Sequence, residues 1–277
     1  MKYTQGLKKG TSSCFFKEWT LDNFMQLKNV GIDCFEISAN YDNYMVNWDF
    51  PKNCMKVAED SRAAGIQFWS IHLPFSRKLD ISSFDDESRN LTIDTNMKLI
   101  EAAAKAGARV AVLHPSSEPI TDDIRKERLA RSKEAIIMLC KQCKKYNMQL
   151  AVENLPRTCL CNSAEEMVEL LRDTGANIIF DTNHSLKEDN LQFLDTLISS
   201  GIKIVSIHIS DYDFVDERHR LPGDGINNWH GIFERLEKAD YRGPLMYEVP
   251  KKPKEREEIS LNILALNMQR LADGEIE

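Results

Sequence analysis

The chain has 277 residues, enough to bury one large core and too few for two sizeable domains. Hydrophobic residues make up 42% and charged residues 29%, as in an ordinary globular protein. The formal net charge of −7 counts against nucleic acid as a partner, because nucleic-acid binders carry basic surfaces. The first ten residues lack the apolar segment of a signal peptide, and no run approaches 18 apolar residues. We therefore expect no membrane association and a cytoplasmic location.

Seven cysteines are scattered along the chain without the spacing of a disulfide framework, which is typical of reduced thiols. Cys140 and Cys143 form a CxxC pair, but they lie on one face of a predicted helix together with Leu129 and Ile136. We interpret both as small apolar core residues rather than as a redox pair or half of a zinc site.

Short apolar runs of strand type alternate with segments of helical periodicity along the whole chain. A first strand is expected somewhere within residues 3–14, and further strands at 33–38, 66–71, 109–114, 148–153, 177–181, 203–208 and 244–249. Helices are expected at 18–30, 51–65, before Gly107, and at 122–146, 163–174, 189–200, 229–239 and 255–271. Eight alternating pairs predict an α/β fold, a (β/α)8 TIM barrel forming a single domain over residues 1–277.

Acidic or histidine residues follow the ends of most of these apolar runs. They are His72, His114, Glu153, Asp181, His208 and Glu248. The carboxyl ends of barrel strands form the mouth at which barrel enzymes place their active sites. The pattern therefore predicts one site at that mouth.

Four of these residues end the fifth to the eighth strand: Glu153, Asp181, His208 and Glu248. Three carboxylates and one imidazole around one point would hold a divalent cation. The oxygen-rich set favours Mn²⁺, Mg²⁺ or Co²⁺ without excluding Zn²⁺.

The two glutamates, Glu153 and Glu248, are predicted to face each other obliquely across the mouth. A cation bound to the oxygens of a 2-keto sugar would stabilise an enediolate, and the glutamates would serve as base and acid. Groups on opposite faces of the substrate give epimerisation, whereas one group working between adjacent carbons gives aldose–ketose isomerisation. The sequence leaves this choice open.

Five of the six histidines fall on the same rim, and His72, His114, His184 and His219 are predicted to contact the substrate. The sixth, His230, is expected to be surface structure. Residues 75–86, with Arg77 and Lys78, are interpreted as a solvated loop rather than a phosphate-binding lid. Three aromatic residues could line a sugar site or pack in the core: Trp48, Phe75 and Trp229.

Short motifs at these strand ends resemble those of the xylose-isomerase-like barrel superfamily. In order they read IHLPF, LHPSS, VENLPR, FDTNH, IHISD, HRLPGDG and YEVP, between about residues 33 and 250. The superfamily includes sugar and sugar-phosphate isomerases and epimerases, inosose dehydratase and the endonuclease IV type of DNA-repair enzyme. The resemblance implies the same barrel fold and does not specify one substrate.

The resemblance to the ketose-epimerase branch implies a divalent metal ion held by Glu153, Asp181, His208 and Glu248, with the glutamates moving the protons. It implies a sugar contact for His184. His219 stands where that branch has a substrate-contacting arginine, although Arg218 and Arg220 flank it.

The resemblance to the endonuclease branch implies three zinc ions. The matching residues are His72, His114, Glu153, Asp181, His184, His208, Glu217, His219 and Glu248, with Glu217 standing where that branch has aspartate. The acidic net charge and the absence of basic residues at 39–44 favour a small sugar or polyol as substrate over DNA. An inosose dehydratase-type lyase, a non-catalytic sugar-binding barrel and a homo-oligomeric state are left open.

Overall fold

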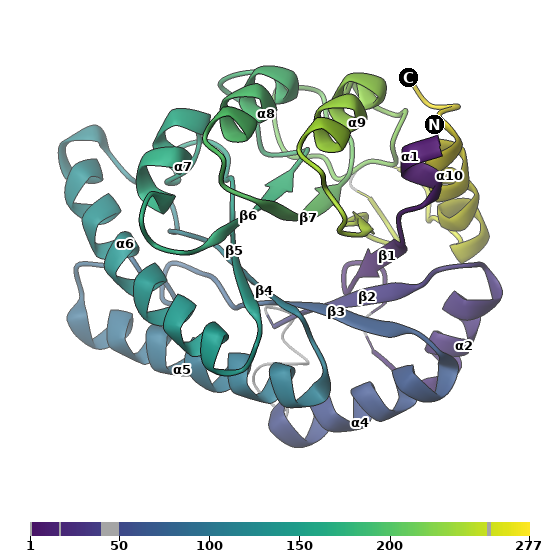
Figure 1. Cartoon of the computed structure of the whole chain (residues 1–277), viewed down its shortest axis with the longest axis horizontal. Helices are drawn as coiled ribbons and strands as arrows, with labels where there is room; N and C mark the ends of the chain where they lie inside the picture. The colour runs from purple at the N-terminus through teal and green to yellow at the C-terminus, as the bar shows by residue number, and fades with distance from the viewer. Residues whose placement is uncertain (1, 17, 40–49, 254–255) are drawn as a thin grey trace.

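The computed structural model describes residues 2–16, 18–39, 50–253 and 256–277 of the chain. In these residues the strands form a closed parallel barrel in which each strand pairs with the next along the chain. The ring closes where β1 (Lys9–Ser12) pairs with β8 (Leu245–Tyr247). Figure 1 shows the strands at the centre and the helices around them. The predicted (β/α)8 TIM barrel is confirmed.

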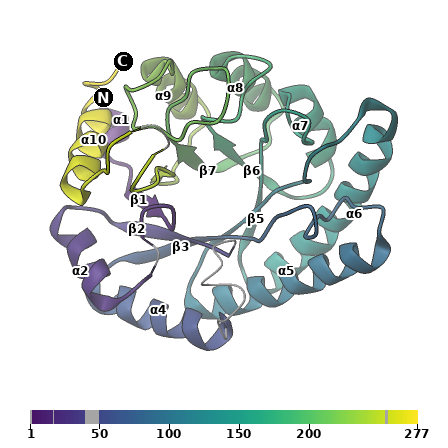
Figure 2. The ribbon, with the colours of Figure 1, turned by 180° about the vertical axis from the view of Figure 1, so that it is seen from behind.

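The remaining strands are β2 (Cys34–Ser38), β3 (Gln67–His72), β4 (Val110–Leu113), β5 (Gln149–Glu153), β6 (Asn177–Asp181) and β7 (Ile204–Ile209). The outer helices are α2 (Leu21–Asn29), α4 (Phe50–Ala64), α5 (Asp86–Ala106), α6 (Asp122–Lys145), α7 (Ala164–Leu171), α8 (Asn190–Ser199), α9 (Trp229–Lys238) and α10 (Leu261–Asp273). The view from behind in Figure 2 shows the same ring of helices. Gly107 ends α5 with a φ of 108°, a left-handed conformation that favours glycine.

The structure differs from the predicted elements mainly near the two ends of the chain. A short helix, α1 (Lys2–Gln5), precedes β1 and lies against α10, where the Thr4 hydroxyl donates a hydrogen bond to the Ala272 carbonyl at 2.6 Å. Helix α10 begins at Leu261 rather than near residue 255, because the Ser260 side chain caps it by accepting from the Ile263 amide. None of the helices in the described ranges has the length and apolar character needed to cross a bilayer.

Two apolar regions hold the barrel together. One lies between the strands and the surrounding helices, and it includes the buried Cys140, Cys143 and Trp229. The CxxC pair is therefore core, as interpreted, and Trp229 is core rather than a wall of the site. The other region fills the lumen of the barrel with Val110, Val112, Ala151 and Ile179. The strands thus carry apolar side chains on both faces, as parallel strands in such barrels do.

Two irregularities in strand pairing shape the lumen. Along β2 and β3 the register passes from Phe35–Phe68 directly to Glu36–Ser70, so Trp69 is an extra residue on β3. Between β6 and β7 the register passes from Ile178–Ile204 to Ile179–Ser206 in the same way. An extra residue in one strand re-aims the side chains that follow it. In β3 it leaves Trp69 packed against the lumen cluster and Ser70 beside Glu36.

Candidate active site

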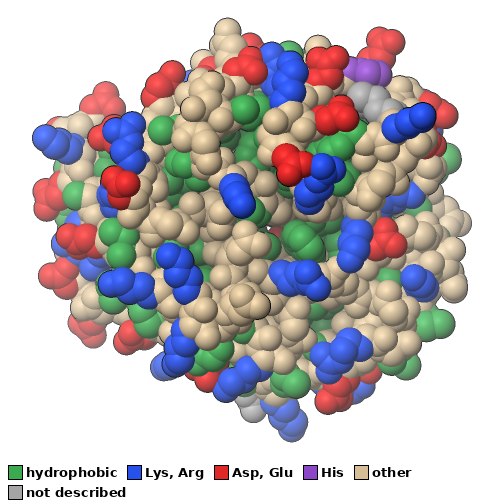
Figure 3. Space-filling model, viewed as in Figure 1, with side chains coloured by type: hydrophobic (Ala, Val, Ile, Leu, Met, Phe, Trp, Pro, Cys, Tyr) green, Lys and Arg blue, Asp and Glu red, His purple; other side chains and the backbone are tan. Residues whose placement is uncertain are grey.

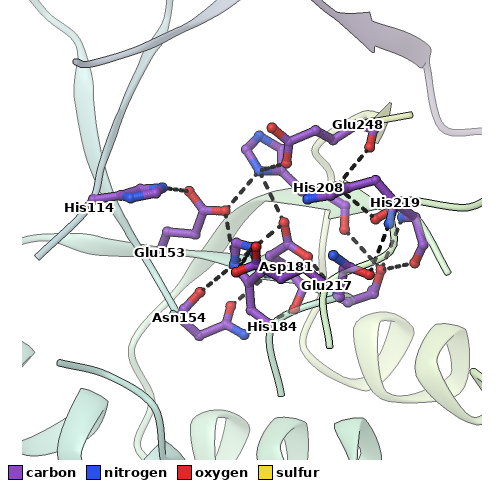
Figure 4. A network of polar contacts seen from close by, with 12 residues as sticks. His114, Glu153, Asn154, Asp181, His184, His208, Glu217, His219 and Glu248 are labelled. Carbon is purple, nitrogen blue, oxygen red and sulfur yellow. Dashed lines mark hydrogen bonds and ion pairs between the residues drawn. The ribbon is translucent and has the colours of Figure 1, made fainter. Parts of the chain in front are cut away.

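The side chains predicted to hold a cation lie together at the carboxyl ends of neighbouring strands (Figure 4). Glu153 and Asp181 end β5 and β6, His208 lies in β7, and Glu248 directly follows β8. Nδ1 of His208 lies 3.0 Å from Glu153 Oε1, 3.0 Å from Glu248 Oε2 and 3.6 Å from Asp181 Oδ2. One ligand atom from each of the four residues lies within 4.8 Å of every other.

The fit of a cation to this set can be judged from Asp181, which is fully buried. Its Oδ1 accepts a hydrogen bond from the Asn183 amide at 2.6 Å, but its Oδ2 has no hydrogen-bond partner. A buried carboxylate oxygen without a partner is costly unless a cation or another charged group compensates it. This oxygen lies 3.6 Å from His208 Nδ1 and 3.7 Å from His184 Nδ1, beyond hydrogen-bond distance. One ligand atom of Asp181 lies within 4.8 Å of one from each of the other three residues, so the donor set fits a divalent cation.

Electrostatics within the cluster hold the groups in opposite charge states. Burial raises the pKa of Glu153, but the facing His208 and His114 more than offset this and hold it well below its usual value. Burial lowers the pKa of His208, yet Glu248, Glu36 and Glu153 raise it well above its usual value. Burial raises the pKa of Asp181, and His184 offsets only part of that shift. The cluster therefore concentrates carboxylate charge that positive groups must balance.

The imidazole rings of His72 and His114 both contact the second carboxylate oxygen of Glu153, Oε2. Their Nε2 atoms lie 3.1 Å and 3.2 Å from Glu153 Oε2, and these three residues form a second group whose ligand atoms lie within 4.8 Å of one another. The ring of Phe75 stacks on His114 with centroids 3.7 Å apart, so this aromatic residue does border the site. Trp48 lies outside the described residues.

The loops after β6 and β7 bring together a third group, His184, Glu217 and His219. His184 Nε2 lies 3.6 Å from Glu217 Oε1, and the pKa of His184 is raised to about 9. Burial alone lowers that pKa, but the surrounding carboxylates of Asp181, Glu217 and Glu153 more than offset it. The residues implied by the two resemblances therefore form three adjoining groups.

Most of the histidines around the cluster are held by backbone carbonyls. Nδ1 of His72 contacts the Leu73 carbonyl at 3.0 Å, and Nδ1 of His184 contacts the Asn154 carbonyl at 2.9 Å. Nδ1 of His219 contacts the Glu248 carbonyl at 3.1 Å. A ring nitrogen that donates to a carbonyl fixes the tautomer and leaves the other nitrogen free to bind a ligand.

Side-chain to backbone hydrogen bonds fix the strand ends that carry the cluster. The Asn154 side chain donates to the Asp181 carbonyl at 3.0 Å and accepts from the Asp181 amide at 2.7 Å. The Thr182 hydroxyl donates to the Ser210 carbonyl at 2.7 Å. These contacts tie the ends of β5, β6 and β7 together, so the geometry of the cluster depends on polar residues next to the acidic ones.

A cavity of about 340 Å³ opens above the cluster. Glu153 and Glu248 line it, together with the four histidines predicted to contact the substrate, His72, His114, His184 and His219. Asp181 and His208 are not among its lining residues, so they lie on the barrel side of the glutamates.

Two arginines on the rim of this cavity belong to different loops. Arg157 ion-pairs with Glu118, Asp216 and Glu217 at 3.0, 3.1 and 3.2 Å. Arg77, from the loop predicted to be solvated, donates to the Glu118 carbonyl at 3.2 Å and also lines the cavity. Three carboxylates therefore surround Arg157, whereas Arg77 donates to a backbone carbonyl.

Glu36 is a site residue that the sequence reasoning missed. It lies in β2, is fully buried, and places its Oε1 2.9 Å from Nε2 of His208. The sequence does contain a signal, because an acidic residue stands inside an otherwise apolar strand run, Cys-Phe-Glu-Ile. Glu36 lies inside its strand, and the pattern of acidic and histidine residues at strand ends therefore does not include it.

Comparisons with known proteins agree with this architecture. The uncharacterised protein MJ1311 of Methanocaldococcus jannaschii is 26% identical over 255 residues, which cover 89% of this chain and 85% of that protein. A solved structure described as a D-tagatose 3-epimerase-like protein is 24% identical with a TM-score of 0.80, covering 97% of this chain and 96% of that one. A D-psicose 3-epimerase from Clostridium cellulolyticum, solved with D-tagatose, is 18% identical with a TM-score of 0.79, covering 97% and 98%.

At identities of 24% and 18%, the similarity to these solved structures shows that this chain shares their fold. A family model described as the xylose isomerase-like TIM barrel matches residues 24–266, most of the chain and all of the strands that carry the cluster. The chain belongs to the xylose isomerase-like TIM barrel family.

Proposed function

We propose that this protein is a divalent-metal-dependent isomerase or epimerase of a small sugar, sugar phosphate or related polyol. The observation that carries the proposal is the position of two glutamates, Glu153 and Glu248, which line the cavity and share a buried cluster with Asp181 and His208. The sugar epimerases among the solved structures of the same fold support it.

Glu153, Asp181, His208 and Glu248 would hold the cation, in keeping with the orphaned oxygen of Asp181. When bound, Mn²⁺, Mg²⁺, Co²⁺ or Zn²⁺ supplies Lewis acidity that polarises a substrate carbonyl and stabilises negative charge on its oxygens. The chain's own contribution is to keep both glutamates ionised and to place them beside the substrate cavity.

The two glutamates differ in their surroundings, which suits different roles in proton transfer. Glu153 is fully buried, and His72, His114 and His208 all lie within 3.2 Å of its oxygens. Glu248 has a side chain that is 16% exposed and contacts the Cys14 thiol at 3.7 Å through Oε1. One would take a proton from the carbon next to the carbonyl, and the other would return a proton to the substrate.

His72, His114, His184 and His219 surround the same cavity and would orient the hydroxyl groups of the substrate. The rim around Arg157 carries three carboxylates, Glu118, Asp216 and Glu217. Their excess negative charge favours an uncharged sugar over a phosphorylated one at this part of the rim.

Proton exchange with solvent tests the proposal directly. Protein loaded with Mn²⁺ would be incubated in D₂O with D-fructose, D-tagatose, D-psicose and L-ribulose and with their phosphates, and exchange next to the carbonyl followed by NMR. We expect Glu153→Gln and Glu248→Gln each to slow exchange about 10²- to 10⁴-fold. Glu127→Gln, an exposed change on α6, is the matched control. Retained exchange in both site variants, or none in the wild type, would contradict the proposal.

A second candidate function is favoured by the two additional ligand groups. His72 with His114, and His184 with Glu217 and His219, each lie next to the four-residue cluster. Three adjoining groups suit a polynuclear centre that cleaves a phosphodiester, as in the endonuclease IV type of enzyme. The surface in Figure 3 carries acidic as well as basic side chains on the face drawn, and the net charge of −7 does not favour DNA.

Metal analysis separates the two candidates. The phosphodiesterase requires close to three zinc ions per chain together with cleavage of a duplex that contains an abasic site. One cation per chain, with no cleavage of that duplex, supports the isomerase or epimerase. An inosose dehydratase-type lyase would share the early proton transfer but release water from the substrate, which NMR of the product detects.

A further inference from the structure

Glu36 occupies an unusual position for a charged side chain. It is fully buried in β2, and its two oxygens have different partners: Oε1 lies 2.9 Å from Nε2 of His208, and Oε2 accepts from the Ser70 hydroxyl at 2.6 Å. His208 and Ser70 are also fully buried. Ionised groups are rarely this buried unless they are paired, so Glu36 needs both contacts.

The pairing irregularity in β3 is what brings Ser70 to Glu36. The register passes from Phe35–Phe68 to Glu36–Ser70, so Trp69 is skipped and Ser70 lies opposite Glu36. Without that extra residue Trp69 would occupy the position opposite Glu36. The strand thus departs from regular pairing at the point where a hydroxyl donor reaches this carboxylate.

His208 is also held differently from the other histidines of the site. His72, His184 and His219 each have Nδ1 against a backbone carbonyl. His208 instead has Nε2 against the carboxylate of Glu36. On its other side, Nδ1 of His208 faces the oxygens of Glu153 and Glu248 at 3.0 Å.

We propose that Glu36 is a positioning residue that keeps the proton of His208 on Nε2 and turns Nδ1 toward the cation site. The inference rests on the proposed cation site. With a cation bound at Nδ1, the imidazole of His208 would be neutral and carry one N–H. An ionised carboxylate is an acceptor only, so it fixes that N–H on the nitrogen it faces. The second nitrogen then offers its lone pair to the cation, and the carboxylate raises its basicity. The Ser70 hydroxyl fixes the orientation of the Glu36 carboxylate.

The test compares three variants of buried lumen residues. Glu36→Gln keeps the shape of the side chain but removes its charge, and Ser70→Ala removes the hydrogen bond that orients it. Ser206→Ala is the matched control, because Ser206 is a fully buried lumen serine whose hydroxyl accepts from Trp69 and does not contact Glu36. Zn²⁺ and Mn²⁺ affinities would be measured by competition with a chelator.

We expect Glu36→Gln to weaken cation binding about 10- to 100-fold. Ser70→Ala should weaken it about 2- to 10-fold, the effect of one hydrogen bond. Ser206→Ala should bind as the wild type does. In Zn²⁺-loaded protein with ¹⁵N-labelled histidine, the His208 Nε2–H signal of the wild type should be shifted downfield by its carboxylate acceptor. This shift should disappear in Glu36→Gln and persist in Ser206→Ala, which a general loss of packing would not produce.

Wild-type protein that binds no cation would overturn the proposed function together with this inference. Cation binding by the wild type with an unchanged affinity and Nε2–H signal in Glu36→Gln would overturn the positioning role alone. If Glu36→Gln does not fold, Ser70→Ala decides the matter, and an affinity equal to that of Ser206→Ala would refute the proposal.

Discussion

The carboxylate of Asp211, two residues after the end of β7, accepts a hydrogen bond from the indole Nε1 of Trp229, which begins α9, at 3.3 Å. The same carboxylate also accepts from the backbone amides of Tyr212, Gly223 and Asn227 at 2.9–3.1 Å. The loop between β7 and α9 thus closes around one acidic side chain. Because Glu217 and His219 lie within it, Asp211 stabilises a part of the site that it does not touch.

Replacing Asp211 by Asn should destabilise this loop. An amide can accept on only one of its two terminal atoms, so at least one buried donor loses its acceptor, and we expect the free energy of unfolding to fall by about 1–3 kcal/mol. Urea unfolding followed by circular dichroism measures this change. Asp224→Asn, at an exposed position of the same loop, should change it by no more than about 0.5 kcal/mol. Equal effects in the two variants would argue against the anchoring role.

Gly225 lies in a part of the same loop that passes close to Asp211. A Cβ atom there would lie 2.3 Å from Asp211 Oδ1 and 2.3 Å from the Tyr212 carbonyl oxygen, and the carbonyl belongs to the backbone. Gly225→Ala should therefore lower the free energy of unfolding by about 1–3 kcal/mol. At Gly6 the nearest atom would lie 3.5 Å away, so Gly6→Ala should be close to neutral. Thermal unfolding of the pair tests this, and a neutral Gly225→Ala would contradict it.

Cation binding should stabilise the fold, because the cluster forms only when the strand ends are in place. At a free cation concentration 100 times the dissociation constant, the gain is about 2.7 kcal/mol. Asp181→Asn should abolish that gain. It should also make the cation-free protein more stable than the wild type, because it removes a carboxylate charge that burial disfavours and one of whose oxygens has no hydrogen-bond partner. Calorimetry with and without EDTA checks both effects, and cation-dependent stabilisation that persists in Asp181→Asn would exclude this ligand set.

The cysteines should differ sharply in reactivity. Cys14 is partly exposed and the other six are buried. Burial raises the pKa of Cys54, Cys143 and Cys159 to about 12. A thiol with a raised pKa stays protonated and unreactive until the pH approaches that value, so between pH 7 and 9 we expect one fast-reacting thiol with Ellman's reagent. Seven should react in denaturant. Cys14→Ser should remove the fast phase, and a second fast thiol in the native protein would contradict the prediction.

The sequence predicted the elements well where local signals are strong. The predicted strand at 177–181 coincides with β6 (Asn177–Asp181), and the helix predicted to end before Gly107 is α5 (Asp86–Ala106). Apolar runs bounded by glycine give clear boundaries. The predicted start of α10, near residue 255, was wrong by several residues. The sequence of residues 255–260 can extend the helical pattern, and only the Ser260 cap decides where the helix begins.

The candidate site was also predicted in part, where local sequence signals sufficed, and missed where tertiary packing decides. Residues that follow strand ends could be listed from the sequence, and the structure brings them into three adjoining groups, while their roles stay predictions. Glu36 could not be paired with His208 in advance, because their proximity depends on barrel closure, which brings β2 and β7 together across the lumen. Nor could the sequence reveal the extra residue in β3, since strand register depends on tertiary packing.

Apolar side chains fill the lumen of the barrel below the cluster, so the site is not reached through the lumen. They are Val110, Val112, Ala151 and Ile179. A molecule that reaches the buried glutamates must enter through the rim and leave by the same route. The residues around that opening, among them Phe75, Arg77 and Arg157, therefore act on product departure as much as on substrate entry. A cavity of about 340 Å³ at this opening has room for a small molecule, or for one group of a longer molecule turned into the mouth.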